Sequence, residues 1–206
     1  MIFSLKRLVI KYKLNIRGVL HIGAHWGQEF SEYDELRIKN MLFFEPVEAN
    51  YKKLLETLPK HRKKIQALKI ALGNKKELKE MYVETRKGQS CSLLEPGLHL
   101  KQYPHIVFDT REMVQVDRLD NIEFSRQWFN MINIDVQGYE LEVLKGSVET
   151  LKSIDIIYTE INRVELYKGG CLMKDLDDFL RPFGFIRVQT KTPEKTWGDA
   201  MYLKYG

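Results

Sequence analysis

The stretch VLHIGAHWGQE, residues 19–29, joins a short apolar run to a turn of small residues. The run ends at Ile22, and Gly23, Ala24 and Gly27 then lead into a segment that we expect to be helical. Small residues let the backbone approach a ligand closely, and the first amides of a helix can meet a polar group. The spacing is G-x-x-x-G and differs from the dinucleotide-binding G-x-G-x-x-G, so tight packing of the strand on the helix without a ligand stays an alternative.

An acidic residue ends the next apolar run. In MLFFEP, residues 41–46, Glu45 lies 18 positions after Gly27 and directly before Pro46. A carboxylate at this place in a nucleoside-binding α/β unit accepts hydrogen bonds from the ribose hydroxyls. The turn and the acid together predict a nucleoside site, and a solvated glutamate at a strand end is the alternative.

Apolar runs alternate with amphipathic stretches from Gly18 onward, which predicts an α/β fold. Strands are expected in GVLHIG, MLFFEP and KIQALKIAL, at 131–136 and at 154–161, with helices in VEANYKKLLETL and over 139–153. A helix at 174–180 and strands at 183–188 and 200–204 complete the pattern. Such units form a parallel sheet with right-handed crossovers, here closed by an antiparallel edge hairpin, and ligands bind beyond the carboxyl ends of the strands.

A third motif, NIDVQGYELEVLKG at 133–146, places Asp135 at the end of a strand and Gly138 in the turn before a helix. Asp135 can cap that helix, or it can contact a cofactor amine or a substrate hydroxyl. Glu160 ends the following strand, and adjacent strands lie about 4.8 Å apart, so the two carboxylates can share one site. The pair is the candidate general base; the alternative is that backbone donors hold each carboxylate.

Two further regions have weaker patterns. Residues 1–17 are expected to form an amphipathic helix that docks on the domain, with association to a membrane surface as the alternative. Residues 18–206 form the domain itself, in which about 73–120 is expected to be a partly irregular, mobile insertion. Within it, GQSCSLLEPG at 88–97 is either a lid over the acceptor or an ordinary surface loop.

Composition limits the functional classes. The chain has 206 residues, enough for one domain with its own core, and its formal charge of +5 weakly favours an anionic or glycan-phosphate partner. Cys91 and Cys171 lie far apart without metal-ligand spacing, which argues against a zinc site and a disulfide framework and favours a cytoplasmic setting. Lysines and arginines interrupt the first 14 residues, so neither a signal peptide nor a membrane span is expected.

The assembled motifs resemble the FkbM-type family of S-adenosylmethionine-dependent methyltransferases over about residues 18–185. Three blocks match in order: VLHIGAHWGQE, MLFFEPVEANYKKL, and NIDVQGYELEVLKG followed by YTEINRVELY. The resemblance implies a class I methyltransferase fold, which is Rossmann-like, with a mainly parallel seven-stranded sheet, an antiparallel edge hairpin and helices on both faces.

The resemblance also implies O-methylation and a set of cofactor contacts. Glu45 would bind the ribose, and Asp135 would lie beside both cofactor and acceptor. The remaining contacts would come from the glycine turn and the IALG segment, namely Gly23, Ala24, His25, Gly27, Ala71 and Leu72. Two positions depart from the family, which usually has an acidic residue at His21 and often a lysine at Asn133.

The sequence therefore predicts a methyltransferase that transfers the methyl group of S-adenosyl-L-methionine to a hydroxyl of a sugar, a glycan or a small metabolite. Positioning of the acceptor and removal of its proton by Asp135 or Glu160 are the main tasks of the protein. No metal is required, although these carboxylates with Asn162 resemble the oxygen ligands of hard cations. The rival functions are a nucleotide-sugar or NAD-dependent enzyme and a catalytically silent scaffold domain; nucleic-acid methylation is not expected.

Overall fold

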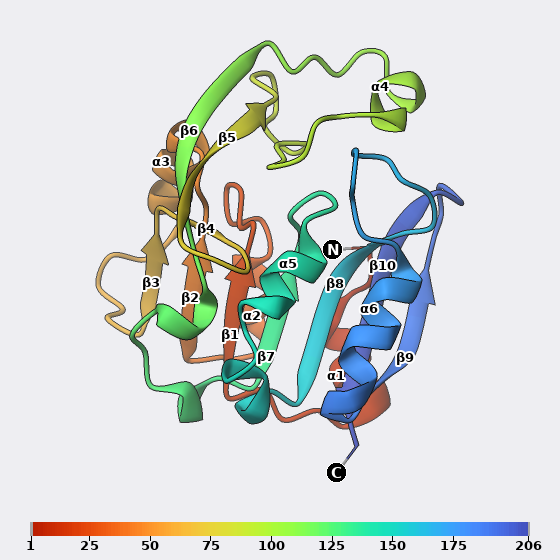
Figure 1. The fold of residues 1–206 in the computed structure, drawn as a ribbon. Helices are drawn as coiled ribbons and strands as arrows, with labels where there is room; N and C mark the ends of the chain where they lie inside the picture. The colour runs from red at the N-terminus through yellow and green to blue at the C-terminus, as the bar shows by residue number, and fades with distance from the viewer. Residues whose placement is uncertain (1, 206) are drawn as a thin grey trace.

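The computed structural model describes residues 2–205 and contains a central sheet of seven strands (Figure 1). Their spatial order is β3 (Ile65–Leu68), β2 (Asn40–Phe44), β1 (Gly18–Ile22), β7 (Met131–Ile134), β8 (Ile156–Asn162), β10 (Trp197–Lys204) and β9 (Phe185–Lys191). The first five strands are parallel, and β10 pairs antiparallel with both β8 and β9. The predicted parallel sheet with an antiparallel edge hairpin is confirmed.

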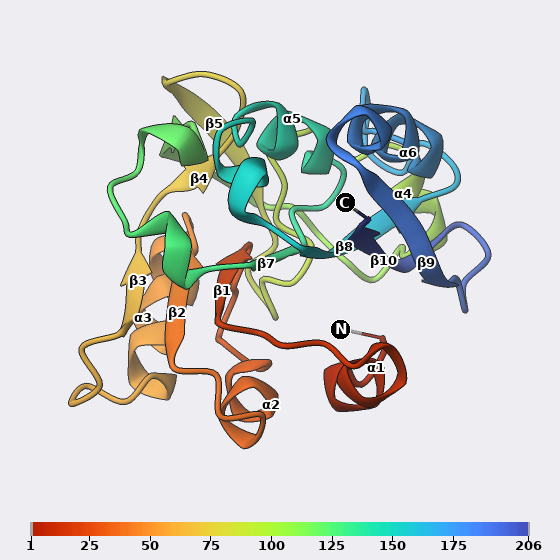
Figure 2. The ribbon, with the colours of Figure 1, turned by 90° about the horizontal axis from the view of Figure 1, so that it is seen from below.

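Helices cover both faces of this sheet, as Figure 2 shows. One face carries α1 (Leu5–Tyr12), α2 (Phe30–Glu35) and α3 (Glu48–Thr57), and the other carries α5 (Glu140–Lys145) and α6 (Met173–Leu180). The buried sheet residues are mainly apolar on both faces, as expected for a parallel sheet between two helical layers. Short 3₁₀ turns lie at Leu119–Asn121, Arg126–Trp128, Thr150–Ser153 and Arg181–Phe183.

The N-terminal helix α1 packs on the sheet through Leu5 and Leu8, which are buried in the same apolar cluster as Met131 and Ile156. The helix ends at Tyr12, well before residue 17, and the Tyr12 hydroxyl donates to the carbonyl oxygen of Val188. Among residues 2–205, no helix is long and apolar enough to cross a membrane.

The segment expected to be an irregular insertion is more ordered than its sequence pattern indicates. A second sheet has the order β4 (Ala71–Leu72), β6 (Thr110–Asp117) and β5 (Glu77–Val83), and a short helix, α4 (Leu98–Gln102), follows the irregular residues 88–97. Only one face of β5 and β6 is buried, through Met81, Val83, Val114 and Val116. This alternation is concealed in the sequence because the buried face also carries Glu77, Lys79 and Glu112, whereas the exposed face carries the apolar Leu78 and Met113.

Two further boundaries differ from the sequence expectations. The run KIQALKIAL is divided between the sheets, since β3 joins the large sheet and β4 the small one. The helix expected over 139–153 is only six residues long. It ends at Lys145, and at the next residue, Gly146, an added Cβ would lie 1.9 Å from the carbonyl oxygen of Gly73, so the two backbones are in direct contact where the helix stops.

Candidate active site

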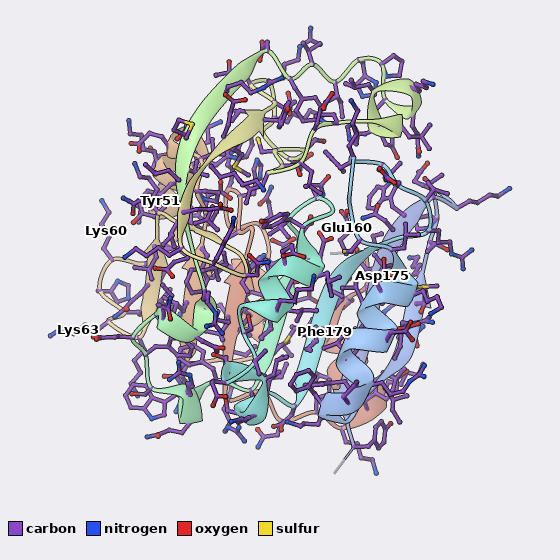
Figure 3. All side chains as sticks on the ribbon, viewed as in Figure 1. Tyr51, Lys60, Lys63, Glu160, Asp175 and Phe179 are labelled. Atoms are coloured by element: carbon purple, nitrogen blue, oxygen red, sulfur yellow. The ribbon has the colours of Figure 1, made fainter. Side chains whose placement is uncertain are left out.

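A cavity of about 600 Å³ opens at the carboxyl ends of β1, β2 and β7 and reaches the residues of the second sheet and α4. Its volume lies within the range of about 300–1,000 Å³ that is typical of small-molecule sites. Glu160 lines this cavity, and Figure 3 labels it toward the upper end of β8. The cavity lining includes seven more of the sequence-predicted site residues, namely Gly23, Ala24, His25, Glu45, Ala71, Leu72 and Asp135.

The glycine turn at the end of β1 brings two strand ends into direct backbone contact. Gly23 has a φ of 79°, and a Cβ added there would lie 1.8 Å from the carbonyl oxygen of Asp135. The amides of Gly23 and Ala24 both donate to the carbonyl oxygen of Phe44, each at 3.0 Å. These two amides therefore already donate to β2. The small residues let the backbones of the two strand ends approach each other, and they do not offer these amides to a ligand.

Gly27 is the one predicted cofactor residue that does not line the cavity. Its φ is 77°, and a Cβ added there would lie 2.8 Å from Leu54 Cδ1 on α3. The glycine thus lets the turn pack against α3, which is the ligand-free interpretation of the spacing for this residue.

Glu45 is a buried carboxylate inside the cavity wall, 5% exposed. Its Oε1 accepts from the amide of Val47 at 2.9 Å, and its Oε2 accepts from the amide of His25 at 2.8 Å. Burial raises the pKa of Glu45 to about 7, and these hydrogen bonds oppose the rise. The side chain of Asn50 also hydrogen-bonds to Glu45, and the carboxylate keeps acceptor capacity for a further hydroxyl.

Asp135 and Glu160 share one donor. The side-chain amide nitrogen of Gln137 donates to Asp135 Oδ1 at 2.8 Å and to Glu160 Oε2 at 2.7 Å. The Tyr167 hydroxyl donates to the other end of the same amide, Gln137 Oε1, at 2.9 Å. Asp135 and Glu160, which the adjacency of their strands predicts to be neighbours, thus lie together in the structure. The residue that links them, Gln137, is not among the site residues predicted from the sequence.

The two carboxylates differ in their access to the cavity. Asp135 is exposed there, whereas Glu160 is 5% exposed. Cavity walls on most sides of Asp135 exclude bulk water, and this raises its pKa to about 6. Burial, together with the nearby Asp135, raises the pKa of Glu160 well above its usual value. At neutral pH the pair therefore carries its negative charge mainly on Asp135.

The turn after β7 is held by Glu140 and not by Asp135. Glu140 Oε1 accepts from the amide of Gly138 at 3.0 Å and from that of Val136 at 3.2 Å. The alternative that Asp135 caps the following helix is therefore wrong, because a different carboxylate receives the turn amides and leaves Asp135 directed to the cavity.

Several cavity residues escaped the sequence analysis. Glu29 and Gln137 lie within the quoted motifs, but the sequence pattern assigns the site to other residues of those motifs. His99 and Tyr103 come from the insertion, and Trp197 and Asp199 come from the edge hairpin, so only the fold brings them to the site. For residues 2–205, no three His, Cys, Asp or Glu side chains are grouped in a way that could hold a metal ion.

The family model of the methyltransferase FkbM domain matches residues 21–187. The chain belongs to this family. The FkbM domain is thus an S-adenosylmethionine-dependent methyltransferase, and the resemblance stated from the three motifs is confirmed.

Individual relatives agree with this assignment. The 2-O-methyltransferase NoeI of Sinorhizobium fredii is 28% identical over 193 residues, which cover 89% of this chain and 77% of that protein. The crystal structure of methyltransferase FkbM from Methylobacillus flagellatus KT superposes with a TM-score of 0.61 at 14% identity and covers 90% of this chain. This chain spans only 43% of that protein, so the likeness concerns the fold of the shared part.

The same fold occurs with the cofactor present. Magnesium protoporphyrin IX methyltransferase from Synechocystis PCC 6803, solved with bound S-adenosylmethionine, superposes with a TM-score of 0.54 at 10% identity. The match covers 98% of this chain and 76% of that one and confirms the class I methyltransferase fold.

The cavity of this FkbM domain suits S-adenosylmethionine in shape and charge. A Cβ at Gly23 has no room, Glu45 has free acceptor capacity, and Ala71 and Leu72 supply an apolar wall beyond it. Carboxylates line the cavity, whereas no lysine or arginine among residues 2–205 does so. Such a surface favours a ligand that carries a sulfonium and an ammonium group.

Proposed function

We propose that this FkbM domain O-methylates a hydroxyl of a sugar, a glycan or a small metabolite. The observation that carries the proposal is the Asp135–Gln137–Glu160 arrangement, in which one amide holds two carboxylates in the same cavity as Glu45. The relative NoeI is a 2-O-methyltransferase, which supports an oxygen acceptor.

The proposed cofactor contacts follow the cavity from one strand end to the next. Glu45 accepts the ribose hydroxyls, because both of its oxygens are fixed by backbone amides and keep lone pairs toward the cavity. Ala71 and Leu72 would hold the adenine. Gly23, Ala24 and His25 would hold the methionine part, and Asp135, which lines the same cavity, would contact both that part and the acceptor.

The protein's own chemical task is small. The cofactor, when bound, would supply an electrophilic methyl group for the acceptor oxygen. Asp135, ionised at neutral pH, would take the proton of the acceptor hydroxyl, and Glu160 and Gln137 hold Asp135 in place. Positioning of the acceptor by the cavity walls would accelerate the transfer.

Calorimetric titration tests the cofactor assignment. S-adenosylmethionine and S-adenosylhomocysteine should bind, whereas NAD and a nucleotide sugar should not. Glu45→Ala should weaken binding at least tenfold, and the exposed Glu123→Ala is the matched control that should not change it. Absence of cofactor binding by the folded wild-type protein would favour the silent scaffold function.

Methyl transfer tests the catalytic assignment. The release of S-adenosylhomocysteine is measured with a panel of neutral glycosides and small hydroxylated metabolites as acceptors. Asp135→Asn should lower kcat by a factor of about 10²–10⁴, which is the usual contribution of a general base, with little change in cofactor affinity. Full turnover by both Asp135→Asn and Glu160→Gln proteins would overturn the assignment.

A further inference from the structure

The cavity continues beyond the two carboxylates to a wall built from two distant segments. His99 and Tyr103 come from α4 and the residue after it, and Trp197 begins β10. Trp197 Nε1 donates to the Tyr103 hydroxyl at 2.7 Å, and the ring centroids of Tyr103 and His99 lie 5.1 Å apart. Gln102 and Thr196 add a side-chain hydrogen bond of 2.9 Å between the same segments. The wall is therefore a fixed part of the fold.

One polar atom of this wall has no hydrogen-bond partner among residues 2–205. His99 is 4% exposed, and its Nδ1 is buried without a hydrogen bond to any described residue. Burial lowers the pKa of His99 to about 4, so the ring is neutral at physiological pH. Because buried polar atoms are nearly always satisfied, this atom indicates a place for a hydroxyl group.

The charge of the lining restricts what can enter. The lining carboxylates are Glu29, Glu45, Asp135, Glu160, Glu194 and Asp199. Lys87 and Lys195 adjoin lining residues along the chain, yet neither lines the cavity. Among residues 2–205, no lysine or arginine side chain brings the chain's formal charge of +5 to the cavity lining. A phosphate placed there would lose its hydration and meet several carboxylates with no lysine or arginine side chain of residues 2–205 in the lining, which is unfavourable.

We propose that the surface formed by His99, Tyr103, Glu194 and Trp197 is the acceptor subsite and that it takes an uncharged, hydroxyl-bearing ring such as a neutral glycosyl unit, while rejecting its phosphorylated counterpart. The aromatic rings offer flat apolar faces for the ring's C–H surface, and the neutral imidazole and the carboxylates receive its hydroxyls. This inference rests on the proposed function and reverses the expectation from net charge that an anionic partner is favoured.

Saturation-transfer NMR on protein saturated with S-adenosylhomocysteine tests the inference without catalysis. The probes are methyl glycosides of common hexoses and deoxyhexoses, each paired with the same sugar carrying a phosphate. At least one neutral glycoside should bind, and its phosphorylated partner should bind at least tenfold more weakly. Equal or tighter binding of the phosphorylated member, or binding of no neutral glycoside, would overturn the proposal.

Two pairs of variants locate the binding. Trp197→Ala should abolish the saturation-transfer signal, whereas Trp128→Ala, which removes a 46% exposed tryptophan that does not line the cavity, should leave it unchanged. Glu194→Lys should improve binding of the phosphorylated sugar about fivefold relative to the neutral one, since it adds a cation at the wall. Glu123→Lys makes the same change of charge outside the cavity lining and should have no such effect.

A second titration separates this inference from the cofactor assignment. If S-adenosylhomocysteine fails to bind, the proposed function fails, and the sugar pairs are then titrated against the free protein. Neutral glycosides that still bind and still lose their signal in Trp197→Ala would support the subsite by itself. Signals that are equal in Trp197→Ala and Trp128→Ala would show that the sugars bind elsewhere.

Discussion

His21 on β1 and Asn133 on β7 are register partners, and Asn133 Nδ2 lies 3.3 Å from His21 Nε2. At these two positions the resemblance to the family implies an acidic residue and, often, a lysine. The same Asn133 nitrogen donates to the Tyr33 hydroxyl at 2.7 Å. Burial lowers the pKa of His21 to about 4, so the two side chains form a neutral pair where the resemblance implies a charged one.

This pairing predicts strong coupling between the two positions. His21→Asp should destabilise the protein by about 3 kcal/mol, because it places an unpaired carboxylate in the sheet, and Asn133→Lys should do so by a similar amount. The double variant, which restores opposite charges, should recover at least about 1.5 kcal/mol of the summed loss. Urea unfolding at pH 7 measures all three. Strict additivity of the two losses would show that the positions do not compensate each other.

The strand ends were the most predictable part of the site. Glu45, Asp135 and Glu160 each follow or end an apolar run, and parallel strands bring their carboxyl ends to one edge, so sequence order alone implies that these side chains are neighbours. Gln137 was not predictable in this way. Its amide bridges the carboxylates because the backbone has a φ of 57° there, a left-handed conformation that the sequence pattern does not reveal.

The acceptor side was hidden for a different reason. Tyr103 and Trp197 are 94 residues apart, and neither belongs to a periodic segment that would predict their contact. Charged residues on the inner face of β5 and β6, such as Lys79 and Glu112, and the exposed apolar Leu78 also made the insertion look irregular. What the sequence pattern conveys is local periodicity and chain order; a contact between an insertion and an edge hairpin depends on tertiary packing.

The glycine turn provides a second prediction, with a control in the same chain. Gly23→Ala should destabilise the protein by more than about 3 kcal/mol, since the added Cβ would overlap the backbone of Asp135. Gly169 has a similar φ of 73° but nothing within 4 Å of an added Cβ, so Gly169→Ala should cost only about 1 kcal/mol. Thermal unfolding of the two variants compares them directly. Equal losses would mean that conformation alone, and not the close approach, requires glycine at position 23.

The raised pKa of Glu45 predicts a pH-dependent cost of folding. The folded state holds the proton more tightly than the unfolded state, because burial raises the pKa from 4.5 to about 7. The stabilising effect of this proton is present below pH 4.5 and is lost as the pH rises through 7. Glu45→Gln removes this titration. The free energy of unfolding of the variant, taken relative to that of wild type, should therefore rise by on the order of 2–3 kcal/mol between pH 4.5 and pH 8.

Chemical denaturation across this pH range, without cofactor, measures the effect. The test compares how the free energy of unfolding of each protein changes with pH. The absolute values differ at every pH, because the single acceptor oxygen of Gln at position 45 can accept from only one of the two backbone donors. Glu123→Gln at an exposed position is the control and should follow the wild-type curve. Parallel curves for wild type and Glu45→Gln would show that Glu45 titrates normally in the folded protein.

The shared amide of Gln137 predicts a shift in the titration of Asp135. A hydrogen bond to an ionised carboxylate lowers its pKa, and the bond from Gln137 opposes the larger effect of burial at Asp135. Gln137→Met keeps the side-chain length and removes the donor, so the pKa of Asp135 should rise from about 6 by roughly one unit. The acidic limb of the pH profile of the methyl-transfer rate should move to higher pH by the same amount, since Asp135 must be ionised to accept the proton.

Carbon-13 NMR of labelled aspartate follows the titration of Asp135 without an acceptor, and Gln115→Met on the exposed face of β6 is the control. An unchanged or lowered pKa in Gln137→Met would mean that the amide does not stabilise the charge on Asp135, and the bridge would then serve only to position Glu160.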